Sequence, residues 1–195
     1  MKLLARLVLW LGGWKPLGGP PTASKYVLIA YPHSSNWDGF WLVIFAAYFG
    51  IRINFLVKHT LFKGVFGPLM RAIGGIAVDR GESQNLVGKM AGKFQEAERL
   101  AIAFPPEGTR RYVDYWKSGF YHVAVGANVP IVLGFLDYGR NEAGLGHLFY
   151  PTGDVGADMD EIRAFYQGMK GRYPEKDGRI RLRQEDPALG KASGS

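Results

Sequence analysis

The chain has 195 residues, of which 47% are hydrophobic, and this composition indicates one folded domain with a substantial core rather than a disordered segment. It contains no cysteine, which excludes disulfides, a cysteine nucleophile and thiolate metal sites, and which is compatible with a cytoplasmic location. The net charge of +7, carried by dispersed basic residues, favours a phosphorylated substrate or an acidic membrane face over nucleic acid.

The first 14 residues show an apolar pattern with helical spacing, which Lys2 and Arg6 interrupt. The run is too short to span a bilayer, which needs ~20 apolar residues. We prefer an amphipathic helix on a membrane surface, and the alternative is a terminal helix packed on its own domain. The glycines and prolines that follow predict a linker, so residues 1–21 are expected to precede a domain of residues 22–170.

Within residues 22–170, apolar runs that predict strands alternate with runs that predict helices. Strands are expected at 26–31, 52–57, 74–81, 100–104 and 129–135, with an edge strand at 145–150. Helices are expected at 39–50, 61–73, after Ser83, and at 119–128 and 158–170. This alternation predicts a single α/β layered domain whose mixed, mostly parallel sheet is flanked by helices. The polar, basic residues 171–195 are expected to form a partly ordered tail.

Polar turns follow several of the predicted strands, where ligands collect in parallel sheets. His33 and Asp38 follow the first strand, and the other turns carry Lys58, Arg80 and the run from Glu107 to Arg110. Asp38 can hold one ring nitrogen of His33 so that the other is free to take a proton. The alternative is a turn histidine with a helix-capping aspartate. The recurrence of polar turns at four strand ends favours a functional site.

The chemistry of these turns points to a base that acts on a substrate hydroxyl. No Gly-x-Ser-x-Gly nucleophile elbow is present, and this favours direct acyl transfer without an acyl-enzyme. Arg80 and Arg110 are suited to an anionic group such as phosphate. Glu107 is expected to position polar groups of the acceptor, and Gly108 to let the backbone approach the ligand. The four histidines lack ligand spacing, so no metal site is predicted.

Four segments, in order over residues 33–131, resemble the motifs of the glycerolipid acyltransferases, the family of the 1-acylglycerol-3-phosphate and lysophospholipid acyltransferases. They are the His-x4-Asp pair His33 and Asp38, the glycine-rich strand that ends in Arg80, the Pro-Glu-Gly-Thr-Arg run 106–110 and Val-Pro-Ile at 129–131. The resemblance implies transfer of a fatty acyl group from acyl-CoA or acyl carrier protein to a lysophospholipid hydroxyl. The family's best-known acceptor is 1-acylglycerol-3-phosphate, which yields phosphatidic acid.

The resemblance also implies roles for individual residues. His33 would be the general base and Asp38 its orienting partner, while Pro130 lies in a motif linked with the acyl donor. The remaining substrate-binding candidates are Arg80, Glu107, Gly108, Thr109, Arg110 and, from its position, Lys58. The chain departs from the family pattern in the doubled Pro105-Pro106 and in Arg111, where a small residue is common.

The expected setting follows from the same resemblance. No cofactor is expected besides the acyl donor, and the expected partners are a lysophospholipid and an anionic membrane surface at the cytoplasmic face, without nucleic acid. One alternative keeps the chemistry and changes the acceptor to another lysolipid or a glycolipid. Another is a lipid-binding membrane module without catalysis, and a third is a basic nucleic-acid-binding domain.

Overall fold

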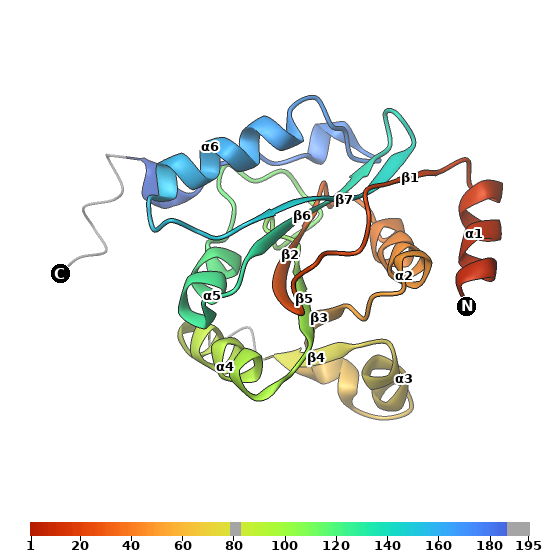
Figure 1. The fold of residues 1–195 in the computed structure, drawn as a ribbon, viewed down its shortest axis with the longest axis horizontal. Helices are drawn as coiled ribbons and strands as arrows, with labels where there is room; N and C mark the ends of the chain where they lie inside the picture. The colour runs from red at the N-terminus through yellow and green to blue at the C-terminus, as the bar shows by residue number, and fades with distance from the viewer. Residues whose placement is uncertain (79–82, 187–195) are drawn as a thin grey trace.

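The computed structural model describes residues 1–78 and 83–186, and within them one seven-stranded sheet forms the centre of the molecule (Figure 1). The strand order is β1-β7-β6-β2-β5-β3-β4. Strands β2 to β6 run parallel to one another, β7 is antiparallel to β6, and β1 is parallel to β7. The predicted mixed, mostly parallel sheet is confirmed. The strands are β1 Lys15–Leu17, β2 Lys25–Tyr31, β3 Asn54–Lys58, β4 Gly75–Val78, β5 Leu100–Phe104, β6 Ile131–Asp137 and β7 Glu142–Phe149.

Helices cover both faces of the sheet. In Figure 1, α4, α5 and α6 lie on one side, and α1 and α2 lie on the other. The α-helices are α1 Lys2–Leu11, α2 Trp37–Phe49, α3 Phe66–Ala72, α4 Ser83–Glu96, α5 Gly119–Ala127 and α6 Val155–Tyr166. Short 3-10 helices are η1 His59–Phe62, η2 Pro174–Lys176 and η3 Arg183–Glu185.

The apolar run of β2 explains this layering. Val27, Ile29 and Tyr31 pack into the core under α4, α5 and α6, whereas Tyr26 and Leu28 pack into the core under α1 and α2. Successive side chains of a strand point to opposite faces, so a strand without polar residues must be covered on both sides. The chain meets this requirement by placing β2 at the middle of the sheet, between β5 and β6.

The structure changes the expectation for the region after α1. Within the predicted linker, Lys15–Leu17 forms β1 and pairs with β7. The strand β7 is therefore covered by β1 rather than lying at the edge of the sheet. Glycine makes this pairing possible, because a side chain at Gly144 would collide with the carbonyl of Leu17.

The predicted helix over 61–73 is divided into η1 and α3. Pro68 lies in the first turn of α3, where the missing backbone N–H is not needed for the helix. Proline therefore marks the start of this helix rather than a kink within it.

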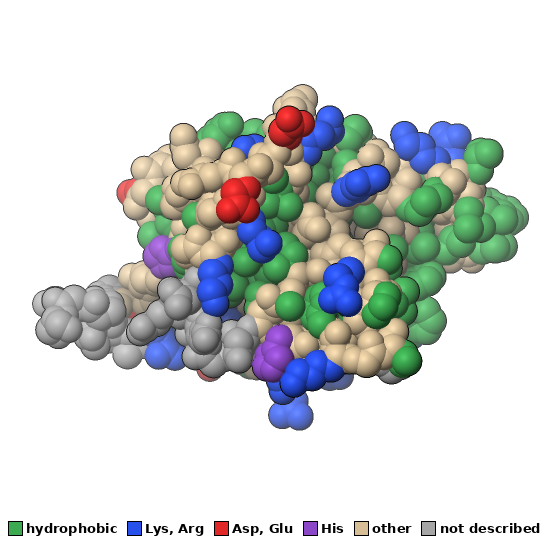
Figure 2. Space-filling model, turned by 90° about the horizontal axis from the view of Figure 1, so that it is seen from below, with side chains coloured by type: hydrophobic (Ala, Val, Ile, Leu, Met, Phe, Trp, Pro, Cys, Tyr) green, Lys and Arg blue, Asp and Glu red, His purple; other side chains and the backbone are tan. Residues whose placement is uncertain are grey.

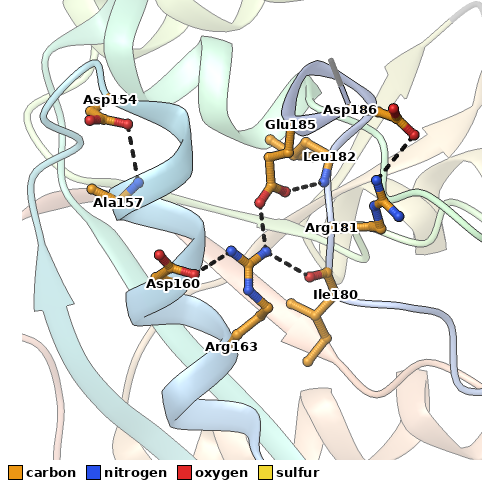
Figure 3. Close-up of polar contacts among 9 residues, drawn as sticks. All are labelled: Asp154, Ala157, Asp160, Arg163, Ile180, Arg181, Leu182, Glu185 and Asp186. Atoms are coloured by element: carbon orange, nitrogen blue, oxygen red, sulfur yellow. Dashed lines mark hydrogen bonds and ion pairs between the residues drawn. The ribbon is translucent and has the colours of Figure 1, made fainter. Parts of the chain in front are cut away.

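Residues 171–186, the first part of the predicted partly ordered tail, pack on the domain and are here called the C-terminal segment. Leu182 is fully buried, and it pairs with Trp116 in a single β-bridge. Arg163 of α6 donates to the carbonyl of Ile180 and forms an ion pair with Glu185 (Figure 3). The segment thus belongs to the folded domain, which extends past residue 170.

Candidate active site

Most of the predicted site residues meet at one edge of the sheet. Because β2, β3, β5 and β6 are parallel, their carboxyl ends lie at the same edge. A cavity of about 1000 Å³ opens there, near the upper end of the volumes of about 300–1,000 Å³ found for small-molecule sites. The site candidates that line this cavity are His33, Asp38, Lys58, Gly108, Thr109 and Arg110.

His33 and Asp38 form the centre of the site. The His33 Nδ1 atom lies 3.3 Å from Asp38 Oδ2, and the two side chains are 21% and 4% exposed. The same Oδ2 accepts a hydrogen bond of 2.8 Å from the backbone N–H of Ser35. Asp38 lies inside the first turn of α2, after the N-cap residue Asn36. An imidazole whose Nδ1–H donates to the Asp38 carboxylate keeps Nε2 available as a base.

Tyr138 is a site residue that the sequence interpretation missed. It follows β6, and its hydroxyl donates a hydrogen bond of 2.8 Å to Asp38 Oδ1. Burial, together with this hydrogen bond to a carboxylate, raises the pKa of Tyr138 far above its usual value, so the phenol keeps its proton. Both carboxylate oxygens of Asp38 therefore accept a hydrogen bond, Oδ1 from Tyr138 and Oδ2 from Ser35. The sequence could have pointed to Tyr138, because this residue also follows a predicted strand, as the other site candidates do.

Glu107 has a different place from the one predicted. It is 1% exposed, and its two oxygens accept hydrogen bonds from backbone N–H groups, 2.8 Å from that of His33 and 2.7 Å from that of Gly178. Burial raises the pKa of Glu107 to about 7, although both backbone hydrogen bonds favour the carboxylate. Glu107 does not line the cavity, because its carboxylate is occupied by backbone donors. It links residues 32–36 between β2 and α2, here called the His33 loop, to the C-terminal segment.

Gly108 supports the turn that positions Glu107. Its φ of +66° lies in the left-handed region, and its N–H donates to the Pro105 carbonyl at 3.0 Å. A side chain at this position would also collide with Lys117. Glycine is thus required by the backbone of the turn.

The inner part of the C-terminal segment, residues 171–178, lies against the His33 loop. The Tyr173 N–H donates to Ser34 Oγ at 3.1 Å, and Gly178 N–H binds Glu107. Tyr173 and Lys176 line the same cavity as His33. Sequence patterns did not reveal this part of the site, because single backbone hydrogen bonds hold it rather than a periodic apolar face.

Several basic side chains line the cavity and also reach solvent, and the part of the cavity that they line is here called its mouth. Lys58, Arg110, Arg111 and Lys176 all line it. Among residues 1–78 and 83–186, no carboxylate forms an ion pair with any of these four. Arg80, the remaining predicted anion-binding residue, lies outside the described residues.

Pro130 is separated from the other candidates. It directly precedes β6, and its carbonyl accepts from Val27 N–H near the start of β2. This position is at the opposite edge of the sheet from His33, and Pro130 does not line the cavity. The structure therefore does not bring Pro130 together with the other candidates, and its contact with substrate stays a prediction.

The interior of the cavity is apolar. It extends between α2 and the sheet, where Leu42, Phe45 and Phe49 come from the helix. The other apolar side chains that line it include Leu28, Ile51, Ile53, Phe55, Ala103 and Leu145. The His33 imidazole, cationic side chains and an apolar interior therefore share one space, which suits an amphiphile with an anionic group.

Comparison with known proteins places this arrangement in a family. The chain matches the family model described as Acyltransferase over residues 20–132. No curated protein matches the chain. Among solved structures, it is similar to the 1-acyl-sn-glycerophosphate (LPA) acyltransferase PlsC from Thermotoga maritima, with a TM-score of 0.56 and 14% identity over 88% of this chain and 79% of that one. This likeness shows a shared α/β fold. Because the family model covers more than half of the chain, including the loops of His33 and Glu107, the protein belongs to the acyltransferase family.

Proposed function

We propose that the protein transfers a fatty acyl group from an acyl thioester, acyl-CoA or acyl carrier protein, to the hydroxyl of a lysophospholipid. The first candidate acceptor is 1-acylglycerol-3-phosphate. The observation that carries this proposal is that the His33–Asp38 pair, several cationic side chains and an apolar interior share one cavity. The name of the similar PlsC structure supports the choice of acceptor.

His33 acts as the general base in this reaction. It takes the proton of the acceptor hydroxyl as the hydroxyl oxygen bonds to the thioester carbonyl carbon. The carbon–sulfur bond then breaks, and the leaving thiolate takes the proton from His33 to become the free thiol. Asp38 orients the imidazole and stabilises its charged form, and Tyr138 holds the second Asp38 oxygen.

The two ends of the substrates are recognised by different parts of the cavity. The apolar wall formed by α2 and the sheet accommodates hydrocarbon. Lys58 and Arg110 bind the acceptor phosphate at the mouth, where charge-assisted hydrogen bonds are favourable. This division orients a lysophospholipid with its glycerol hydroxyl between the apolar interior and the basic mouth, beside His33.

Membrane-surface association is part of the proposal. Helix α1 packs on α2 and buries Ala5 and Leu9, so part of the helix packs on its own domain. Most of its other apolar side chains are exposed, among them Leu3 at 79% and Trp10 at 75%. Figure 2 shows hydrophobic side chains gathered at the end of the molecule where α1 lies. An exposed apolar patch of this kind supports shallow insertion into a membrane surface.

The charge and the helix lengths bear on how such association occurs. No helix in the described part of the chain is long and apolar enough to cross a membrane. The net charge of +7 favours the anionic, cytoplasmic leaflet. Replacing Leu4 and Leu7 of α1 by aspartate should greatly reduce co-sedimentation with vesicles that contain anionic lipid, while thermal unfolding changes little. Unchanged co-sedimentation would show that α1 is not the membrane contact.

A screen of acyl donors against acceptors tests the catalytic proposal. Purified protein with acyl-CoA or acyl carrier protein and 1-acylglycerol-3-phosphate should form phosphatidic acid and release free thiol, as followed by mass spectrometry. The His33→Ala variant should fold, as judged by circular dichroism, and should lose this activity. Turnover that persists in His33→Ala would reject His33 as base. Lipid binding without turnover of any donor and acceptor pair would favour a non-catalytic lipid-binding module.

A further inference from the structure

Backbone hydrogen bonds before and after Lys176 in the chain hold this residue close to the His33 loop. Before it, Tyr173 N–H binds Ser34 Oγ, next to His33. After it, Gly178 N–H binds Glu107 Oε1, and the other oxygen of Glu107 binds the His33 N–H. Only one turn of 3-10 helix, η2, lies between these two attachments. The backbone of Lys176 therefore has little freedom to leave the mouth of the cavity.

The Lys176 side chain is also directed by a local contact. Its Nζ atom lies 4.2 Å from the centre of the Tyr173 ring, a cation–π distance, and both side chains line the cavity. No carboxylate within residues 1–78 and 83–186 forms an ion pair with Lys176. By contrast, Arg140, Arg163 and Arg181 each bind a carboxylate. An oriented but unpaired cation in a pocket wall is suited to a ligand anion.

From these contacts we propose that Lys176 binds a phosphate group of a substrate and helps to determine which substrates are used. This rests on the acyl-transfer function proposed above. Lys176 lies outside residues 20–132, which match the family model, so the C-terminal segment adds a recognition element to the site. The phosphate belongs either to the lysophospholipid acceptor or to the pantetheine-bearing acyl donor, since both would reach His33 through the same mouth.

Steady-state kinetics of Lys176→Met distinguish these sources. If the phosphate is that of the acceptor, the KM for 1-acylglycerol-3-phosphate at saturating donor should rise about tenfold, with little change in kcat. If it is that of the donor, the KM for acyl-CoA at saturating acceptor should rise instead. Lys176→Arg should restore most of either loss, because it keeps the charge. Unchanged KM values for both substrates would overturn the proposal.

Arg179→Met is the matched control. Arg179 is an exposed cation of the same segment, but it does not line the cavity. The KM values of Arg179→Met should therefore match those of the wild type. If Arg179→Met raises KM as much as Lys176→Met, the effect is one of overall charge and the proposal fails. If the wild type shows no acyl transfer, the proposed function fails. Titration of short-chain lysophosphatidic acid then tests Lys176, which is supported only if Lys176→Met binds more weakly than wild type.

Discussion

The two parts of the C-terminal segment use basic residues in opposite ways. In the outer part, residues 179–186, Arg181 pairs with Asp186, and Arg163 of α6 binds both the Ile180 carbonyl and Glu185 (Figure 3). In the inner part, Lys176 faces the cavity without a carboxylate partner among the described residues. Arg163 attaches the outer part to α6, whereas Lys176 lines the cavity, where an anionic group of a ligand can reach it. Substitutions near the cavity should therefore change activity, whereas those in the outer part should change stability.

The largest effect on activity is expected from Asp38→Asn. The amide keeps the size of the side chain but removes the charge that stabilises protonated His33, and it turns an acceptor into a donor. We expect kcat to fall about a thousandfold while the circular dichroism spectrum is retained. The control is Asp160→Asn on the exposed face of α6, which should keep full activity. Near-normal kcat in Asp38→Asn would remove the pair from the mechanism.

Glu107→Gln tests the link between the cavity and the C-terminal segment. Glutamine presents one oxygen and one NH₂ group, so either His33 N–H or Gly178 N–H loses its acceptor. The free energy of unfolding should fall by about 1–3 kcal/mol, and kcat should fall about tenfold as the His33 loop loosens. The exposed Glu175→Gln is the control for stability and activity. A variant with wild-type stability and kcat would show that this link is dispensable.

The pH dependence of stability follows from the same residue. Burial raises the pKa of Glu107 from its usual 4.5 to about 7 in the folded protein. A raised carboxyl pKa contributes stability that is complete below about pH 4.5 and is lost as the pH rises through 7. Glutamine does not titrate, so the stability difference between wild type and Glu107→Gln should narrow over this range. Denaturant unfolding of both proteins at several pH values measures this difference in the free energy of unfolding. A difference that stays constant with pH would contradict the raised pKa of Glu107.

Tyr138→Phe should have a smaller effect on activity. It removes only the hydroxyl that binds Asp38 Oδ1, while the Ser35 N–H still holds the other oxygen. We expect kcat to fall about three- to tenfold with little change in the KM of either substrate, because Tyr138 acts through Asp38. Tyr150→Phe, an exposed tyrosine, is the control. A change confined to KM would instead indicate that Tyr138 contacts substrate.

The smallest effect on activity is expected from Arg163→Met, in α6, which removes the side chain that holds the outer part. Its guanidinium contacts Asp160, the Ile180 carbonyl and Glu185, so its loss should lower the free energy of unfolding by about 1 kcal/mol, a value reduced by solvent screening. Activity should stay close to that of the wild type at temperatures where the protein is folded. A large loss of activity without a loss of stability would break the distinction between the two parts of the segment.

The sequence by itself determined the layered α/β class and the centre of the site. The apolar run of residues 26–31 is short and has no charged position, and this pattern favours a strand covered on both faces. Parallel strands bring their carboxyl ends to one edge, so the loops of His33, Lys58 and Arg110 could be assigned to one site from their order along the chain. These features are local or periodic, and for that reason they can be read from residue types.

Only the tertiary structure decided the contacts that have no periodicity. Nothing in the sequence indicates that Gly178 N–H and His33 N–H share the carboxylate of Glu107, or that Tyr138 reaches Asp38. Residues 171–186 appeared to be a tail because they are polar, yet single hydrogen bonds and the buried Leu182 attach them to the domain. Such contacts depend on which distant segments the packed core brings together, and this is a property of the whole fold rather than of any local pattern.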